Sequence, residues 1–277
     1  MLGRDLLALL RREGEEASGL ARHDVDVTDA AAVRSVIRQR QPGVVVNCAA
    51  WTAVDEAETH EKEALAVNGS GAGNLAAACS ASDAKLIQLS TNYVFSGTAS
   101  QPYPEDAPAR PRTAYGRTKL AGEEAVLRRL PDAGYIIRTA WLYGAQGPNF
   151  VRMMIRLERT RPWINVVDDQ HGQPTWTMDV AARIVDLAWS GAAAGIYHVT
   201  SSGETTWCGL AREIFRLLGA DPCRIEGVPS TAMNRPASRP AYGVLSHAAW
   251  AAASLQPIPN WRFGLRRAFP PLLAAEA

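Results

Sequence analysis

Two apolar runs on either side of a helical stretch constrain the fold of this 277-residue chain most. The first, GVVVNCAA at residues 43–50, is continuous, which is typical of a parallel strand buried on both faces. The second, KLIQLST at residues 85–91, ends in two hydroxyl side chains, and residues 56–78 between the runs have a helical pattern. A strand, a helix and a further strand in this order predict a parallel sheet with helices on both faces.

The same alternation continues along the chain. We expect a helix from Leu2 at the start and a helix that Thr28 caps and that buries Val33 and Ile37. The residues EASGLA at 16–21 are expected to form a short strand. Further helices are expected at residues 114–130, 150–158, 177–189 and 207–218, and further strands at 135–144, within 163–176 and at 195–201. Residues 228–246 are rich in Pro and Ser, which predicts a binding or packing loop.

These elements predict an α/β fold with a Rossmann-like doubly wound parallel sheet and a smaller C-terminal substrate-binding lobe. We expect residues 1–145 to form the dinucleotide-binding domain and residues 174–200 to return to it. Residues 146–173 and 201–277 are expected to form the substrate-binding lobe.

Charge and cysteine content exclude several classes of protein. The net charge is +1, and no basic stripe with interleaved aromatic residues is present, so a nucleic-acid partner is not expected. The four cysteines never form a Cys-x-x-Cys pair, which argues against a zinc site and a disulfide framework and suits a reducing compartment. No stretch reaches the roughly 18 apolar residues that span a bilayer, and the first ten residues have no cleavage site after them. We therefore expect a cytoplasmic protein that is not associated with a membrane.

A tyrosine lies four positions before a lysine at Tyr115 and Lys119. With seven tyrosines and only three lysines in the chain, chance would give such a pair roughly 0.08 times. On a helix the two side chains share one face, where the ammonium lowers the pKa of the phenol toward neutrality. A tyrosine tuned in this way can exchange a proton with an alcohol or a ketone oxygen. Thr91 ends a predicted central strand, where ligands bind in open α/β sheets, and could hydrogen-bond the same oxygen.

This set of residues, in its order and spacing, resembles the extended short-chain dehydrogenase/reductase family. Further segments narrow the resemblance to the dTDP-4-dehydrorhamnose reductase family; in chain order they are VVVNCAAWTAVDEAE, LSTNYVFSGT, TAYGRTKLAGE, RTAWLYG, GPNFVRMM, VVDDQHGQPTW, GIYHVT, TTW and RPASRP. The resemblance covers the whole chain and includes dihydrostreptose synthase and other deoxysugar 4-ketoreductases of antibiotic pathways. It implies an oxidoreductase that reduces the C4 ketone of a dTDP-4-keto-6-deoxysugar with NAD(P)H.

The resemblance also implies roles for individual residues. Tyr115 would be the proton donor, and Lys119 would both tune it and bind the nicotinamide ribose. Other residues implied at the cofactor are Gly3, Asp26, Val27, Ala50, Trp51, Thr52 and Leu89. Residues implied at the substrate are Thr91, Asn92, Trp141, Asn149, Arg235 and Arg239. Trp141 would offer a flat face to the sugar, although simple core packing stays open. The two arginines and Asn149 are candidates for holding the diphosphate, although a surface-loop role stays open.

The sequence departs from the family pattern at both ends of the site. Asn92 stands where the motif usually has Asp, and Ser96 stands where Asp is common; we expect these losses of charge to affect substrate choice more than catalysis. The glycine-rich turn that follows the first strand of the family is represented only by Gly3, its last glycine. We therefore expect that Met1 is not the natural start and that roughly ten to fifteen residues precede it.

The residue after the second strand usually selects the cofactor. An acid there binds the ribose 2′-hydroxyl, and a basic residue accommodates a 2′-phosphate. Here Arg22 and His23 follow the predicted strand, with no acid until Asp24. We therefore expect a preference for NADPH over NADH.

Two other functions remain open from the sequence. A sugar epimerase or dehydratase would share the fold, but a dehydratase would want an acid beside Thr91, and Asn92 is uncharged. A non-catalytic cofactor-binding regulatory subunit is favoured by the incomplete glycine turn and disfavoured by the intact Thr91, Tyr115 and Lys119 set. The exact sugar and the C4 stereochemistry are not fixed. A homodimer and a magnesium ion are both compatible with the resemblance, but no ligands for a metal can be assigned.

Overall fold

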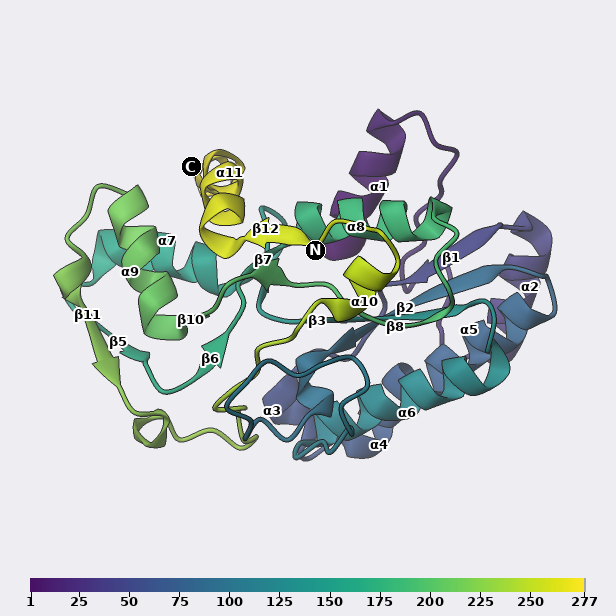
Figure 1. The fold of residues 1–277 in the computed structure, drawn as a ribbon, viewed down its shortest axis with the longest axis horizontal. Helices are drawn as coiled ribbons and strands as arrows, with labels where there is room; N and C mark the ends of the chain where they lie inside the picture. The colour runs from purple at the N-terminus through teal and green to yellow at the C-terminus, as the bar shows by residue number, and fades with distance from the viewer. Residues whose placement is uncertain (277) are drawn as a thin grey trace.

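The computed structural model describes residues 1–276 and is built around a central parallel sheet (Figure 1). The strand order is β1–β2–β3–β8. These strands are β1 (Val44–Asn47), β2 (Lys85–Thr91), β3 (Gly134–Thr139) and β8 (Gly195–His198). Because the strands are parallel, their carboxyl ends lie along one edge of the sheet, and Thr91 is paired there with Thr139.

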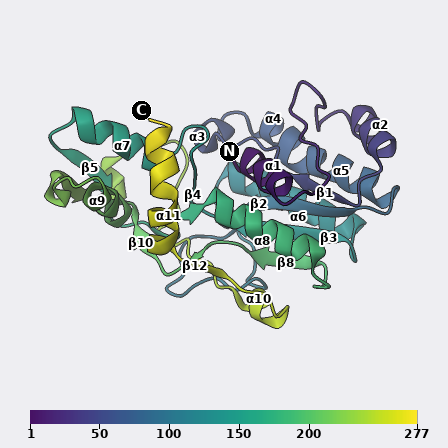
Figure 2. The ribbon, with the colours of Figure 1, turned by 90° about the horizontal axis from the view of Figure 1, so that it is seen from above.

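Helices cover both faces of the sheet, as Figures 1 and 2 show. One face is covered by α1 (Leu2–Arg12), α8 (Thr177–Trp189) and α10 (Ala248–Ala252), and the other by α2 (Ala30–Arg40), α5 (Gly71–Ser80) and α6 (Ala114–Arg129). Successive residues of a strand point to opposite faces. Ile87 therefore joins the core under α1 and α8, whereas Leu86 joins the core under α2, α5 and α6. The predicted parallel sheet with two helical layers is confirmed.

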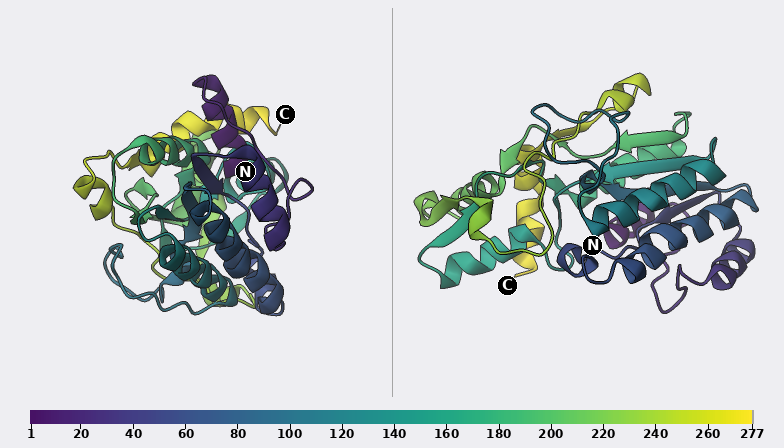
Figure 3. Two further views of the ribbon diagram at one scale, coloured as in Figure 1. Left: turned by 90° about the vertical axis from the view of Figure 1, so that its right-hand side faces the viewer. Right: turned by 90° about the horizontal axis from the view of Figure 1, so that it is seen from below.

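A second packed region lies at the other end of the molecule, on the left of Figure 1 and on the left of the right panel of Figure 3. It contains α7 (Phe150–Thr160), α9 (Trp207–Leu217), α11 (Trp261–Ala274) and the parallel pair β5 (Ile164–Val167) and β11 (Ile225–Val228). Met154, Phe215 and Trp261 are fully buried in its core. The predicted assignment of residue ranges to two domains stays a prediction.

Further short elements complete the structure. They are α3 (Val54–Ala57), α4 (Glu61–Leu65), β4 (Leu142–Tyr143), β6 (His171–Gly172), β7 (Thr175–Trp176), β9 (Ser201–Ser202), β10 (Thr205–Thr206) and β12 (Ile258–Asn260). Residues 229–247 form a long loop, as the sequence predicts, with only a single 3-10 turn and two isolated bridges. Within residues 1–276, no helix has both the length and the apolar character to cross a bilayer.

Two local predictions were wrong, and a third holds in part. Residues 16–21 form no strand. The run at 43–50 packs against the cores on both faces of the sheet, but its three valines are only half-buried, because β1 pairs only with β2 in the described chain. Thr28 does not cap α2. The Asp29 carboxylate accepts from two backbone N–H groups of the first turn, whereas the Thr28 hydroxyl donates to Asp26 at 2.7 Å.

Candidate active site

The structure brings the three predicted catalytic residues together at the carboxyl edge of β2. Thr113 starts α6, because its hydroxyl accepts from the N–H of Gly116 at 3.0 Å. Tyr115 lies in the first turn of this helix and Lys119 one turn later. Thr91 ends β2, and its side chain lies near enough to the Tyr115 hydroxyl to oppose the rise in the pKa of Tyr115. The sequence spacing thus becomes a cluster of a hydroxyl, a phenol and an ammonium.

Two glycines allow α6 to approach its neighbours closely. A Cβ on Gly116 would lie 2.2 Å from the carbonyl oxygen of Tyr93, and one on Gly122 would lie 2.2 Å from that of Asn68. Real Cβ atoms do not approach oxygen at such distances, so any larger residue would push α6 outward. Because Tyr115 and Lys119 lie on this helix, the glycines set how far both side chains reach.

Tyr115 is half-buried and packs edge-on against Tyr93, with 5.6 Å between ring centroids. Burial of its hydroxyl raises the pKa of Tyr115 to about 12, although the interaction with Thr91 works in the opposite direction. The prediction that Lys119 lowers this pKa toward neutrality was therefore wrong for the structure as it stands. Tyr115 holds its proton at neutral pH, which suits a donor.

Lys119 is buried and donates from Nζ to the carbonyl oxygen of Leu89 at 2.5 Å. Burial lowers the pKa of Lys119 to about 8, while Glu123 and Cys48 raise it. An ammonium carries three donor hydrogens, and Leu89 accepts one of them. The remaining donors can bind hydroxyl groups of a ligand.

The loop after β1 contains three residues predicted at the cofactor: Ala50, Trp51 and Thr52. The backbone of Trp51 is held at both its N–H and its carbonyl by the amide of Asn68, at 2.9 and 3.1 Å. Asn68 also donates to the hydroxyl of Thr118 on α6 at 3.1 Å. It lies in a single π-helical turn, Ala66–Ser70, a feature that often marks functional sites. Asn68 could not be predicted from the sequence, since apolar periodicity carries no signal for a π turn.

The residues predicted near the amino end lie on both sides of the sheet, since α1 covers one face and Val27 packs against the core on the other. Gly3 is on α1, where a Cβ would contact Cys48 at 3.4 Å. Arg22 is 87% exposed and lies 3.6 Å from the carboxylate of Asp26. The carbonyl of the neighbouring Val27 accepts from Asn74 at 3.0 Å. The roles of these residues at the adenine end of a cofactor stay predictions.

On the substrate side, Asn92 is buried and donates from its amide nitrogen to the carbonyl of Gly243 at 3.0 Å. A carboxylate in this position could not donate. The departure from Asp at residue 92 therefore ties the end of β2 to the long C-terminal loop.

Trp141 has a backbone φ of +47°, which is rare for a bulky residue and marks a constrained position. Its ring stacks on Trp207, with 3.6 Å between centroids and 12° between planes. A Cβ on Gly172 would lie 2.4 Å from the Trp141 ring, so only glycine fits beneath it. Trp141 was predicted from the sequence but its partner Trp207 was not, because stacking across 66 positions leaves no local pattern.

Two candidates for the diphosphate, Arg235 and Arg239, lie four positions apart in the C-terminal loop, and the third, Asn149, lies before α7. Arg239 pairs with Asp55 at 2.8 Å, and Asp55 also accepts from the N–H of Ala237 at 3.2 Å. Burial alone would raise the pKa of Asp55, but the hydrogen bonds from Arg239 and Ala237 hold it below its usual value. Arg235 is exposed. Asn149 caps α7, and its amide nitrogen donates to Gly144 at 2.8 Å.

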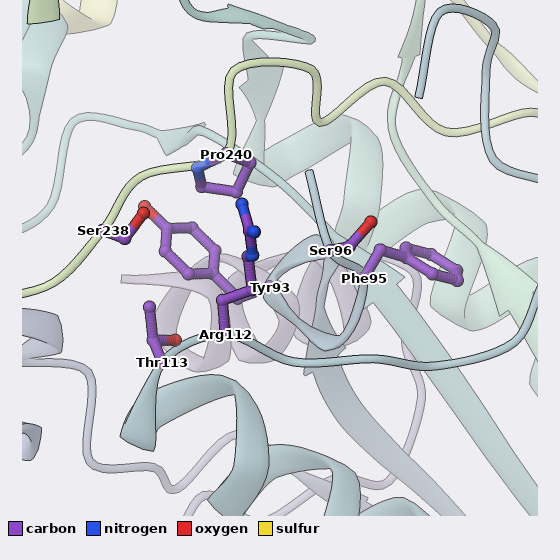
Figure 4. A pocket seen from close by; sticks show the side chains of 7 residues that line it. All are labelled: Tyr93, Phe95, Ser96, Arg112, Thr113, Ser238 and Pro240. Atoms are coloured by element: carbon purple, nitrogen blue, oxygen red, sulfur yellow. The ribbon is translucent and has the colours of Figure 1, made fainter. Parts of the chain in front are cut away.

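Figure 4 shows a small hollow between the end of β2, the segment before α6 and the C-terminal loop. Its lining residues are Tyr93, Phe95, Ser96, Arg112, Thr113, Ser238 and Pro240. Tyr93 lies in the middle of this group, between Thr113 and Ser238 (Figure 4). The hollow is adjacent to the catalytic cluster, because Tyr93 also packs against Tyr115.

Comparison with known proteins gives the family. The family described as "RmlD substrate binding domain" matches residues 1–273. The chain belongs to this family. A dTDP-4-dehydrorhamnose reductase of Streptomyces griseus is 58% identical over 98% of this chain and 91% of its own length. A dTDP-4-keto-6-deoxy-D-glucose reductase of Streptomyces niveus is 54% identical over 100% of this chain and 96% of its own.

A solved structure supports the fold of this family member. It is dTDP-4-dehydrorhamnose reductase from Bacillus anthracis in complex with NADP, with a TM-score of 0.93, 34% identity and coverage of 97% of this chain and 95% of that one. The predicted Rossmann-like class is confirmed. In residues 1–276, no group of three or more His, Cys, Asp or Glu side chains is placed to hold a metal ion.

Proposed function

We propose that this protein reduces the C4 ketone of a dTDP-4-keto-6-deoxysugar with NADPH, in the biosynthesis of rhamnose or an antibiotic sugar. The observation that carries the proposal is the cluster of Thr91, Tyr115 and Lys119 at the carboxyl end of β2. It occurs in a chain 58% identical to a protein named dTDP-4-dehydrorhamnose reductase. A dihydrostreptose synthase or another nucleotide-sugar epimerase or reductase is the alternative within the family.

The proposed chemistry divides the work between cofactor and protein. When bound, the nicotinamide supplies the hydride that adds to C4. Tyr115 gives its proton to the resulting oxygen, and its pKa of about 12 keeps that proton available at neutral pH. Thr91 donates a hydrogen bond to the same oxygen and so orients the ketone. The free donors of the Lys119 ammonium fit the hydroxyls of a nicotinamide ribose.

The substrate lies on the side of the C-terminal loop in this proposal. Trp141 covers the sugar, Asn92 contacts it, and Arg235 and Arg239 bind the diphosphate with Asn149 nearby. The loop at residues 50–52 lines the cofactor, and Arg22 favours NADPH over NADH. A cytoplasmic location and a homodimer remain predictions from the sequence.

An NADPH oxidation assay with a panel of dTDP-4-keto-6-deoxysugars tests the proposal. The wild-type protein should oxidise NADPH only when a sugar is present. Tyr115→Phe removes the transferable proton and should lower turnover by roughly two or more orders of magnitude, with substrate binding less affected. Tyr135→Phe is a matched control, because the Tyr135 hydroxyl donates to the carbonyl of Ala192 at the amino end of β3, away from the candidate site.

The outcome separates the classes of function. Near-normal turnover of Tyr115→Phe would remove this residue from the mechanism. No turnover by the wild-type protein with any sugar, together with NADPH binding, would instead indicate a regulatory subunit.

A further inference from the structure

A buried ion pair lies directly behind the candidate catalytic residues. Glu123 is one helical turn beyond Lys119 on α6, and its carboxylate accepts from both sides of the Arg138 guanidinium. The distances are 3.0 Å from Nε to Oε1 and 2.6 Å from Nη2 to Oε2. The hydroxyl of Ser90 donates to the same carboxylate. The Arg138 and Glu123 side chains are only 3% and 2% exposed, so this bidentate pair is shielded from water.

The partners of Glu123 come from the two strands at the centre of the sheet. Ser90 on β2 and Arg138 on β3 are direct cross-strand neighbours, and the next pair in the register contains Thr91. One carboxylate therefore fastens α6 to β2 and β3 immediately before the residue that ends β2. Because Lys119 lies on α6, this link also fixes its distance from Thr91.

Glu123 is also the anion that most raises the pKa of Lys119. The groups that face Lys119 are Glu123 on its own helix, the Cys48 thiol after β1 and the Leu89 carbonyl on β2. Burial raises the pKa of Cys48 to about 11, so the thiol is uncharged at neutral pH. Beyond Arg138, burial lowers the pKa of His198 on β8 to about 3, so this imidazole is neutral as well.

We propose that Glu123 is a positioning residue for the reaction: it holds α6 in register with β2 and places a negative charge one turn beyond Lys119 on the same helix face. Ser90 and Arg138 hold the carboxylate in place. This inference rests on the proposed roles of Tyr115 and Lys119.

Glu123→Gln tests the electrostatic part of the proposal. The amide retains an acceptor for Ser90 but removes the charge, so Lys119 should lose its proton at lower pH. The alkaline limb of the kcat/KM profile for NADPH should move down by about one pH unit. A residue that only supports the fold would change the amplitude of this profile without moving the limb.

A second variant separates charge from stability, since Glu123→Gln alone leaves Arg138 buried without its partner. This single change should lower the melting temperature by about 10 °C. Glu123→Gln combined with Arg138→Met leaves no unpaired charge and should recover most of that loss, while the alkaline limb stays shifted. Asp179→Asn is the control, because it breaks another ion pair of a buried carboxylate, with the half-exposed Arg267 at 2.9 Å, that joins α8 to α11. It should leave the limb where it is in the wild-type protein.

The results decide between the proposals. The role of Glu123 would be overturned if the alkaline limb of the double variant lay at the wild-type pH. The same holds if the limb and the melting temperature returned to their wild-type values together. Either result would leave the proposed reductase function intact. A double variant that does not fold also counts against it, because the network would then be a requirement for folding. If the wild-type protein shows no turnover, the proposed function fails first.

Discussion

On the sheet side of the site, Lys119 and Thr91 are buried, and the link through Glu123 joins three elements of regular structure. On the loop side, Arg239 is held by a partly exposed carboxylate, and the ring of Trp141 rests on that of Trp207, which belongs to α9. In the proposed function, the first arrangement fixes atoms that move a proton, and the second holds surfaces that admit a sugar nucleotide. Catalysis and substrate recognition are therefore expected to respond differently to mutation.

The largest effect should follow Lys119→Met on the sheet side. Loss of a buried ammonium next to the reacting groups should lower kcat at least about a hundredfold and raise the KM for NADPH. Lys85→Met is a matched control: Lys85 begins β2, the strand that Thr91 ends, and donates to the carbonyl of Ala188 at 3.3 Å, away from the site. Steady-state kinetics of both variants measure the difference. Similar losses in both would mean that the sheet side is merely sensitive to any lost lysine.

A smaller effect is expected at the loop side from Trp207→Leu. Trp207 supports the ring of Trp141, and a stacked aromatic pair contributes about 0.5–1.5 kcal/mol beyond burial. The KM for the sugar nucleotide should rise up to about tenfold, with kcat and the KM for NADPH nearly unchanged. Trp163→Leu is the control, because that side chain is 65% exposed. A fall in kcat instead of a rise in KM would show that the two sides are not separable in this way.

The same contrast explains which features the sequence could predict. Strands β2 and β3 and helix α6 follow from local pattern, since apolar periodicity acts within a few residues. Thr91, Tyr115 and Lys119 lie on those elements, so their proximity followed from the topology. The strand at residues 16–21 failed because a strand needs a neighbour, and periodicity does not supply one.

Long-range partners could not be predicted from local pattern. Arg239 and Asp55 are 184 positions apart, and Glu123 and Arg138 become partners only when α6 packs across β3. Glu123 did carry one usable signal, because it lies four residues after Lys119 and therefore on the same helix face. A charged residue on a helix face predicted to be buried indicates that a partner exists, although not which residue it is.

Asp55→Asn should have a smaller effect still. The folded pKa of Asp55 is below its usual value, so its contribution to stability is complete above the unfolded pKa and is lost as the pH falls through the folded one. A partly exposed pair contributes about 0.2–1 kcal/mol. Urea unfolding at pH 7 should show a loss of that size, and the two proteins should converge as the pH falls below about 4. A difference that persists at the lowest pH would mean that the amide disturbs the loop for another reason.

The smallest effect concerns cofactor choice and the exposed segment around Arg22. This side chain is 87% exposed and weakly paired with Asp26, so it can turn toward a 2′-phosphate without breaking a buried contact. One exposed charge–phosphate contact is worth about 1 kcal/mol or less, so Arg22→Ala should raise the KM for NADPH by up to about fivefold and leave that for NADH unchanged. Arg38→Ala, on α2, is a control for loss of a surface arginine. A lower KM for NADH than for NADPH in the wild-type protein would overturn the expected preference. An equal rise for both cofactors in Arg22→Ala would place Arg22 away from the 2′-phosphate.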